Sequence, residues 1–253
     1  MIHFVGAGPG AADLITLRGA RLLKEAGMII YAGSLVNPEL LKLAKKDCEI
    51  YDSARMTLDE VVEKLRKAHG SGVDAVRLHT GDPSIYGAIR EQMDRLKALR
   101  IPYDITPGVS SFCAAAAAAE AEYTLPSVSQ TVIITRMEGR TPVPEREKIR
   151  SLAAHHASMV LFLSAGMLDA LCAELIAGGY GPQTGAALVY KASWPDQKVL
   201  RGTLAELPRL AGQAGISRTA LVLVGDFLGD EYELSKLYDK HFSHGFRKAA
   251  EER

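Results

Sequence analysis

The sequence has no long hydrophobic run and few cysteines. No apolar stretch reaches the ~18 residues that a membrane-spanning helix needs, and the N-terminus enters a predicted strand directly, without a signal peptide. Cys48, Cys113 and Cys172 are far apart and form no C-x-x-C pair. This spacing favours free thiols in a reducing cytosol over a zinc site. We therefore predict a cytoplasmic protein with no membrane partner.

An excess of charge is also absent. Thirty Lys and Arg residues balance thirty Asp and Glu residues in a chain of 253, so we predict no nucleic-acid partner. No G-x-x-x-x-G-K-[ST] loop is present, which argues against a nucleoside triphosphate as ligand. The pairs His155-His156 and His241-x-x-His244 have no further ligands near them in the sequence, so we predict no metal site.

Short apolar strands alternate with amphipathic helices in the first half of the chain. In "TLDEVVEKLRKAHG", Thr57 and Glu60 form a capping box and Gly70 ends the helix. Further helices are predicted from Thr16 onward, over 38–46 and over 86–99, with strands at 28–31, 49–51 and 102–105 between them. This order predicts an α/β fold with a largely parallel sheet that helices cover on both faces.

The pattern changes near Pro126. Strands predominate there, and those at 185–190 and 199–203 are separated only by a short loop. We predict two α/β domains: residues 1–120 with the parallel sheet and residues 121–229 with a mixed sheet. Residues 230–253 form a charged tail, predicted as a solvated helix or a partly disordered segment.

The first strand runs into a glycine loop, "FVGAGPGAADLIT", which fits G-x-G-x-x-A. That pattern makes a Rossmann-type dinucleotide oxidoreductase an alternative. Two features oppose it. The helix starts only after Thr16, too late to face a pyrophosphate, and the second strand ends in Tyr31-Ala32-Gly33-Ser34 without the acidic residue that binds a ribose.

Four loops follow predicted parallel strands: "GAGPG", "YAGSLV", "TGDPSIYG" and "TPGVSS". Ligands of open parallel sheets bind at the carboxyl ends of the strands, so these loops are the candidate site. Asp82 is their single carboxylate. Its alternative role is to stabilise its own turn, as Asp before Pro often does. Loops of this composition suit a ligand with an ammonium group or ribose hydroxyls better than a polyphosphate.

The motifs "VGAGPGAADLITLRGARLL", "LHTGDPSIYG" and "TPGVSSFCAAAA", in this order, closely resemble the tetrapyrrole (class III) S-adenosylmethionine-dependent methyltransferases. Second-half motifs such as "LVYKASWPDQKVLRGTL" extend the resemblance over nearly the whole chain. It implies a cofactor cleft between two domains, a homodimer, and methylation of a tetrapyrrole with S-adenosyl-L-methionine, which leaves S-adenosyl-L-homocysteine. "TGDPSIYGAI" departs from the "GGDP" and "FGRG" of the uroporphyrinogen branch, so a corrin precursor is the expected substrate.

The resemblance also implies site residues. Cofactor contacts carried over by motif are Pro9, Thr80, Gly81, Asp82, Ile85, Ser110, Ser111, Leu163, Ala192 and Ala220. Substrate-side candidates are Gly8, Tyr31, Ser34, Arg55, Arg136 and Lys191, with Arg140 as a further cation, because the substrate carries many carboxylates.

Other roles stay open at this point. Trp194 either stacks on the macrocycle or pins its own loop, and no catalytic residue is assigned. The remaining alternatives are another tetrapyrrole C-methyltransferase of the same pathway, a non-enzymatic tetrapyrrole carrier and an RNA-modifying relative.

Overall fold

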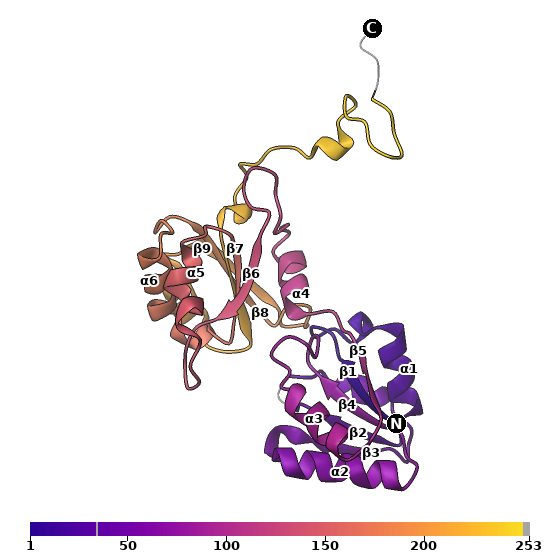
Figure 1. The fold of residues 1–253 in the computed structure, drawn as a ribbon. Helices are drawn as coiled ribbons and strands as arrows, with labels where there is room; N and C mark the ends of the chain where they lie inside the picture. The colour runs from indigo at the N-terminus through magenta and orange to yellow at the C-terminus, as the bar shows by residue number, and fades with distance from the viewer. Residues whose placement is uncertain (34, 250–253) are drawn as a thin grey trace. The chain divides into compact units, whose positions relative to one another are not determined.

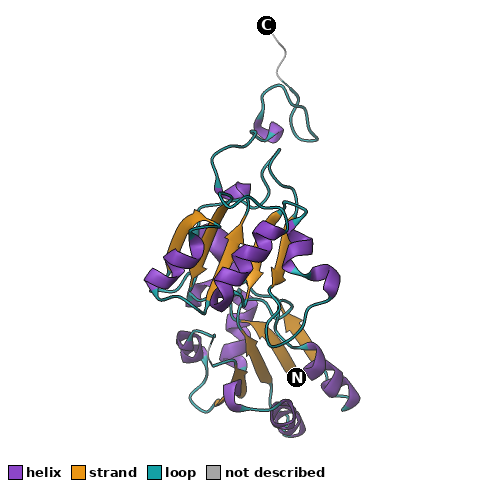
Figure 2. Ribbon diagram, turned by 90° about the vertical axis from the view of Figure 1, so that its left-hand side faces the viewer, coloured by secondary structure: helices purple, strands orange, loops and turns teal. Residues whose placement is uncertain are grey.

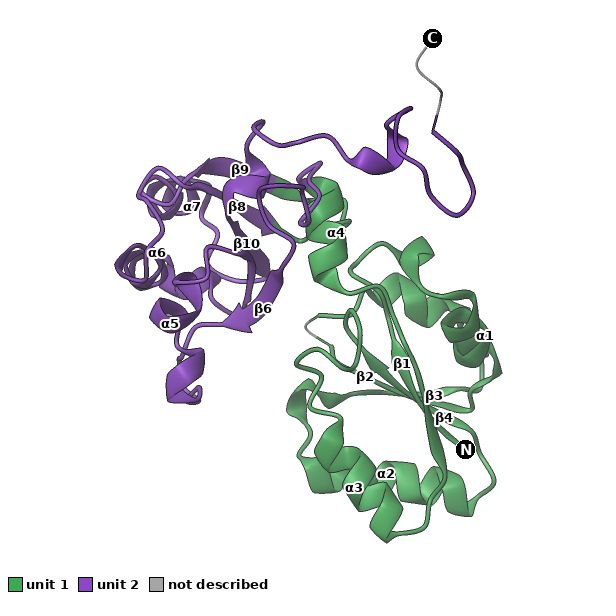
Figure 3. Ribbon diagram, turned by 45° about the horizontal axis from the view of Figure 1, so that its top comes forward, with its two compact units in different colours: residues 1–118, 190–198 green, residues 119–189, 199–253 purple. Residues whose placement is uncertain are grey.

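The structure is a computed structural model that describes residues 1–33 and 35–249 (Figure 1). The chain divides into two compact units (Figure 3). The first comprises Met1–Ala118 and Tyr190–Lys198, and the second comprises Ala119–Val189 and Val199–Arg253. Residues 190–198 therefore belong to the first unit, although they lie inside the sequence range expected for the second domain.

The first unit contains a five-stranded sheet in the order β3-β2-β4-β1-β5. Every neighbouring pair is parallel, which confirms the prediction for this half of the chain. The strands are β1 (Ile2–Gly6), β2 (Met28–Tyr31), β3 (Glu49–Asp52), β4 (Ala75–His79) and β5 (Tyr103–Thr106).

Helices flank both faces of this sheet (Figures 2 and 3). They are α1 (Leu17–Glu25), α2 (Leu58–Gly70) and α3 (Arg90–Ala98), and the unit also contains α4 (Ser111–Ala118). Leu23 of α1 packs with Ile29 and Val76 on one face. On the other face, Leu65 of α2 and Leu96 of α3 share a core with Phe4 and Ile30. The central strand β4 is buried along its whole length as a result.

Two helix starts follow the predicted caps. Thr16 Oγ1 accepts a hydrogen bond from Gly19 N–H at 3.1 Å, and α2 has the capping box of Thr57 and Glu60. The helix predicted over 38–46 is wrong, and the helix predicted over 86–99 is present but starts later than expected. Residues 38–46 contain only a 3₁₀ helix, η2 (Pro38–Leu43), and the helix expected from residue 86 begins at Arg90. Left-handed φ angles at Tyr86 (55°) and Ala88 (49°) prevent an earlier start.

The second unit contains a sheet in the order β6-β7-β10-β8-β9. β6 and β7 are parallel and β10 is antiparallel to β7, so the predicted mixed sheet is confirmed. The strands are β6 (Val132–Arg136), β7 (Ser158–Phe162), β8 (Gly185–Tyr190), β9 (Lys198–Thr203) and β10 (Ala220–Val224). The helices are α5 (Ile149–Ala153), α6 (Leu168–Ala177) and α7 (Leu207–Ala214).

Short 3₁₀ helices connect these elements. Besides η2 they are η1 (Ala12–Leu14), η3 (Ser53–Arg55), η4 (Glu145–Glu147), η5 (Ala165–Met167), η6 (Asp226–Leu228) and η7 (Lys236–Tyr238). Within residues 230–249 of the tail, η7 is the one helical turn, so the predicted solvated helix is wrong there. Within the described ranges, the structure has no helix with the length and apolar character needed to cross a membrane.

Candidate functional site

The loops after β1, β2, β4 and β5 meet at one edge of the first sheet, because these strands are parallel neighbours. The loops after β1 and β4 are joined directly. Gly81 N–H donates to the Gly8 carbonyl at 2.8 Å, and Gly8 N–H donates to the Gly81 carbonyl at 3.3 Å. The sequence prediction that these loops share an edge is therefore confirmed.

Two glycines, Gly6 and Gly108, allow the loops to approach this closely. A Cβ atom at Gly6 would lie 2.6 Å from Gly108 Cα, and one at Gly108 would lie 2.2 Å from the Gly81 carbonyl oxygen. Such distances leave no room for a side chain. The first glycine of the loop after β1 is therefore needed for contact between neighbouring backbones.

The amide groups of the glycine loop (residues 6–11) are largely used within the protein. Ala7 N–H donates to the His79 carbonyl at 2.7 Å, and Ala11 N–H donates to Ser193 Oγ at 3.0 Å. Gly8 N–H is taken up by Gly81, as described above. The 3₁₀ helix η1 then separates the loop from α1. A pyrophosphate clamp needs free amides and an adjacent helix start, so this geometry disfavours a dinucleotide ligand.

Residues 190–198 lie against the glycine loop. The indole Nε1–H of Trp194 donates to the Pro9 carbonyl at 3.2 Å. A Cβ atom at Gly10 would lie only 2.1 Å from Trp194 Cδ1, so the indole occupies the space above this glycine. Asn37 Nδ2 donates to the Gly10 carbonyl at 2.8 Å. Trp194 thus holds the glycine loop and not only its own loop, a role not considered from the sequence, while stacking on the macrocycle stays a prediction.

Asp82 joins the loops after β4 and β5. Its Oδ2 accepts from Gly108 N–H at 2.9 Å, and its Oδ1 accepts from Ser84 N–H at 2.8 Å and from the Ser84 hydroxyl at 2.5 Å. Partial burial alone would raise the pKa of Asp82, but hydrogen bonds from Ser84 and Gly108 outweigh it and lower the pKa. Both carboxylate oxygens of Asp82 therefore accept hydrogen bonds from the protein and stabilise the turn, which is the alternative role considered from the sequence. A cofactor contact of Asp82 stays a prediction.

The other first-unit candidates for the cofactor surround this junction. Thr80, Gly81 and Ile85 belong to the loop after β4, and Ser110 and Ser111 stand at the start of α4. Pro9, Ser110 and Ala192 are buried. Ala192 precedes Ser193 in the segment that contacts the glycine loop. Gly8 and Tyr31, on the substrate side, lie at the ends of β1 and β2 at the same edge.

Three candidates belong to the second unit and share one edge of its sheet. Arg136 ends β6 opposite Phe162, which precedes Leu163. Val222 pairs with Leu161 in the antiparallel register, so Ala220 is level with Leu163. Leu163 is 68% exposed and has a left-handed φ of 53°. An exposed leucine held in this conformation is available for contact with an apolar ligand surface.

The candidate cations for substrate carboxylates differ in their surroundings. Arg136 donates to the carbonyls of Met137, Thr141 and Pro142, so its own loop occupies it. Lys191 Nζ lies 2.6 Å from Asp196 Oδ2, and this hydrogen bond raises the pKa of Lys191. Arg55 and Arg140 are exposed. Ser34 lies outside the described residues.

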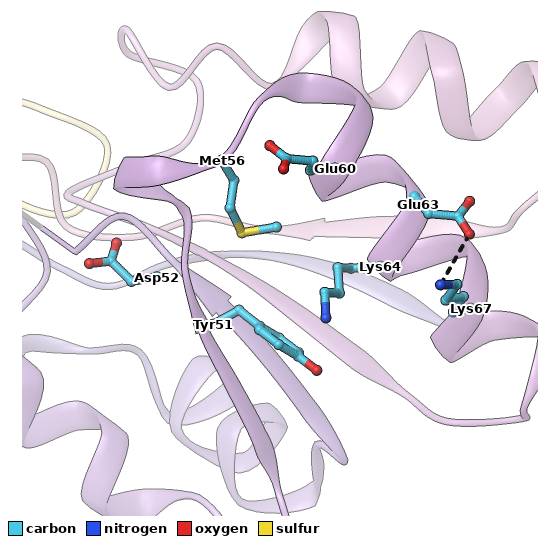
Figure 4. A pocket seen from close by; sticks show the side chains of 7 residues that line it. All are labelled: Tyr51, Asp52, Met56, Glu60, Glu63, Lys64 and Lys67. Carbon is cyan, nitrogen blue, oxygen red and sulfur yellow. Dashed lines mark ion pairs between the residues drawn. The ribbon is translucent and has the colours of Figure 1, made fainter.

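A groove of the first unit lies between β3 and α2 (Figure 4). Its charged groups are engaged with protein partners. Lys64 Nζ lies 3.7 Å from the centre of the Tyr51 ring, Lys67 pairs with Glu63, and Glu60 belongs to the capping box. Among the described residues, no three His, Cys, Asp or Glu side chains form a group that could hold a metal ion. We therefore place the candidate site at the loop edge.

Sequence reasoning missed several residues that build this edge. Asn37 and Ser193 act on backbone groups far away in the sequence, and no local pattern marks such a role. Arg77 did carry a signal, because it is a charged residue inside the apolar strand "AVRLH". Its partner Gln92 lies in α3.

The chain was compared with known proteins. The model of the family described as Tetrapyrrole (Corrin/Porphyrin) Methylases matches residues 1–208. The cobalt-precorrin-4 C(11)-methyltransferase of Methanocaldococcus jannaschii is 54% identical over 249 residues, which cover 98% of this chain and 96% of that protein. The precorrin-4 C(11)-methyltransferase of Mycobacterium tuberculosis (strain H37Rv) is 48% identical over 231 residues, covering 91% and 92%.

Solved structures agree with these matches. The X-ray structure of a cobalt precorrin-4 methyltransferase superposes with a TM-score of 0.89 at 45% identity, covering 90% of this chain and 96% of that one. The uroporphyrin-III C-methyltransferase of Thermus thermophilus, complexed with S-adenosylhomocysteine, gives a TM-score of 0.75 at 26% identity, covering 90% and 92%. These matches agree with the expected two-domain α/β fold.

Proposed function

The chain belongs to the tetrapyrrole (corrin/porphyrin) methylase family, and we propose that it methylates C-11 of precorrin-4 or cobalt-precorrin-4 with S-adenosyl-L-methionine, in cobalamin biosynthesis. The observation that carries this proposal is the 54% identity to a cobalt-precorrin-4 C(11)-methyltransferase along almost the full length of both chains. Relatives named for the cobalt and the metal-free substrate both match closely, so the proposal covers both forms. Any cobalt arrives as part of the substrate.

The loop edge fits S-adenosyl-L-methionine in its chemistry. The stretches 6–11, 80–85 and 107–111 contain no Lys or Arg, and Asp82 is their single carboxylate. This composition suits a positively charged ligand without phosphate. The cofactor supplies a methyl group that is already activated on a sulfonium sulfur, so the protein needs no strong nucleophile of its own. Its residues have to orient the two reactants and exclude water.

We propose that the cofactor contacts are the ten residues carried over by motif, from Pro9 to Ala220, and that no side chain acts as a strong base. Ser110 offers a test because it is only 6% exposed and follows Gly108, whose N–H donates to Asp82, by two residues. Ser110→Ala is expected to weaken S-adenosylhomocysteine binding severalfold, since one hydrogen bond contributes about 1 kcal/mol. An unchanged dissociation constant would remove Ser110 from the site.

The substrate-side contacts are proposed to be Gly8, Tyr31, Ser34, Arg55, Arg136 and Lys191. Because Arg136 and Lys191 already have protein partners, exposed Arg55 is the first to test. Arg55→Gln is expected to raise the KM for the tetrapyrrole while leaving the affinity for S-adenosylhomocysteine unchanged. Equal KM values of the variant and the wild type for the tetrapyrrole would exclude Arg55 from the substrate site.

We also propose a cytoplasmic homodimer with domain boundaries near residues 120 and 229. Exposed large apolar side chains in the tail, including Leu234, Tyr238 and Phe246, support an additional contact surface. Sedimentation of the full chain tests the oligomeric state, and a monomer at micromolar concentration would contradict the dimer.

Methyl transfer tests the function itself. The full chain is incubated with methyl-labelled S-adenosyl-L-methionine and precorrin-4, with and without cobalt, and the product is located by NMR. Label at C-11 is the expected result. Tight binding of the macrocycle without transfer would indicate a carrier, whereas binding of NADH with oxidation of a substrate would indicate an oxidoreductase.

A further inference from the structure

Arg77 is a cation in the middle of the buried strand β4. Only 7% of the residue is exposed, and its register partners in the flanking strands are the fully buried Phe4 and Ile30. Burial lowers the pKa of Arg77 to about 10, with no carboxylate among the causes, so the guanidinium stays charged at neutral pH. Burial of a cation without an acidic partner is destabilising, because the charge loses its hydration. The hydrogen bonds of Arg77 must therefore offset this cost.

These hydrogen bonds form a short chain of contacts. Arg77 Nη1 donates to the Ile30 carbonyl at 3.2 Å, and Arg77 Nε donates to Gln92 Oε1 at 3.1 Å. Gln92, itself 5% exposed, donates from Nε2 to the Ala88 carbonyl at 3.0 Å. One guanidinium and one amide therefore join the backbone of β2 to the backbone beyond β4.

Both ends of this chain reach segments of the candidate site. Ile30 precedes Tyr31, the last residue of β2. Ala88 closes the loop that contains Gly81, Asp82 and Ile85, and its φ of 49° is left-handed. An alanine in this conformation persists only where its surroundings hold it. The hydrogen bond from Gln92 is such a restraint.

The remaining titratable neighbour is neutral. His79 lies two residues along β4, and its Nε2 is buried without a hydrogen-bond partner among the described residues. Burial, and then the charge of Arg77, lower the pKa of His79 to about 3. Arg77 thus provides the one positive charge of the group formed by Arg77, His79 and Gln92. A carboxylate at position 92 would meet this charge directly.

We propose that Arg77 and Gln92 are positioning residues for cofactor binding: together they fix the conformation of the 80–89 loop relative to the end of β2. This inference rests on the proposed function, because it treats that loop as part of the cofactor site. Neither residue needs to touch the cofactor, so both act through the backbone of residues 80–89.

Gln92→Glu separates this role from a purely structural one. The carboxylate keeps the shape of the side chain and can pair with Arg77, so thermal stability should be equal to or above that of the wild type. It cannot donate to the Ala88 carbonyl, however, and would repel it. We expect a severalfold rise in the dissociation constant of S-adenosylhomocysteine, corresponding to one lost hydrogen bond. If Gln92 had a purely structural role, the affinity for S-adenosylhomocysteine would change only as thermal stability changes, so a stable Gln92→Glu variant would bind like the wild type.

Two further variants complete the test. Arg77→Lys keeps the charge but loses the planar arrangement of donors. We expect this variant to bind S-adenosylhomocysteine more weakly than the wild type. We also expect faster hydrogen exchange in its peptides that cover residues 80–89. Arg90→Gln, on the exposed side of α3, is the matched control and should change neither the affinity for S-adenosylhomocysteine nor the hydrogen exchange of residues 80–89.

The outcomes are distinguishable. Wild-type affinity in Gln92→Glu, or unchanged exchange over 80–89 in Arg77→Lys, would overturn the inference alone. Failure of the wild type to bind S-adenosylhomocysteine would overturn the proposed function.

Discussion

The glycine loop after β1 and the loop after β4 lie at the same sheet edge, but different parts of the chain hold them. Side chains from distant segments, Asn37, Ser193 and Trp194, restrain the glycine loop. The loop after β4 is restrained mainly by its own Asp82 and by Gln92 just beyond it. One loop thus depends on contacts with remote segments, including the steric fit of Trp194 against Gly10, and the other mainly on hydrogen bonds of residues in or near the loop.

Gly10→Ala should cause the largest effect, because it breaks the steric fit. The new methyl group would overlap the Trp194 indole, at 2.1 Å from Cδ1. Overpacking of this kind costs about 2 kcal/mol in the free energy of unfolding. Urea denaturation followed by circular dichroism measures the loss, and S-adenosylhomocysteine binding should weaken with it.

A double-mutant cycle shows whether Trp194 is the cause. In a Trp194→Ala background the same Gly10→Ala change should have almost no effect, since the obstructing ring is gone. Gly70→Ala is the control in the same unit, because nothing lies within 4 Å of its added Cβ and alanine is favoured in a helix. Equal losses in both backgrounds would disprove the proposed fit.

Asp82→Asn tests the other kind of restraint. The amide can accept from Ser84 only by turning its NH₂ group toward the Gly108 N–H, which places donor against donor. We expect a loss of about 1 kcal/mol in the free energy of unfolding and weaker S-adenosylhomocysteine binding. Wild-type stability in this variant would mean that the Asp82 hydrogen bonds contribute nothing net.

The pH dependence follows from the same carboxylate. The folded-state pKa of Asp82 is below its ordinary value, so its stabilising contribution is fully present above the unfolded-state pKa of about 3.9 and is lost as the pH falls through the folded-state value. The stability difference between wild type and Asp82→Asn should therefore shrink as the pH falls from 5 to 3, a window set by ordinary carboxyl pKa values of roughly 4. A constant difference across this window would contradict the direction of the pKa shift.

Trp194→Phe should have a smaller effect than the changes above. Phenylalanine keeps much of the contact with Gly10 but leaves the Pro9 carbonyl without the indole donor. A loss of up to about 1 kcal/mol is expected. Circular dichroism during thermal unfolding provides the measurement, and Asp196→Asn, which removes only an exposed partner of Lys191, should lose less. A larger loss in Asp196→Asn than in Trp194→Phe would mean that the Lys191–Asp196 ion pair, and not the Trp194 hydrogen bond, stabilises this segment.

Local sequence signals predicted most of the framework. The cap at Thr16, the capping box at Thr57 and Glu60, and the strand–helix alternation are short-range features, and each is present. The false helix over 38–46 and the early start at residue 86 have a different origin. Their apolar spacing is helical, but that spacing does not reveal the left-handed backbone at Tyr86 and Ala88 or the 3₁₀ geometry of Pro38–Leu43.

The site was predictable to a more limited extent. Loops at strand ends and the family motifs pointed to the sheet edge where the loops after β1, β4 and β5 meet. Trp194 and Ser193 lie more than 180 positions from their partners Pro9 and Ala11, so only the folded chain reveals that they hold the glycine loop. For Asp82, the sequence identified the residue but could not show that protein donors already occupy both oxygens.

We propose that this loop edge binds S-adenosyl-L-methionine and no dinucleotide. A calorimetric titration of the wild-type chain with S-adenosylhomocysteine, run beside an identical titration with NADH, tests it most directly. We predict saturable binding of S-adenosylhomocysteine and no heat of binding for NADH. Saturable binding of NADH, with none for S-adenosylhomocysteine, would contradict the account.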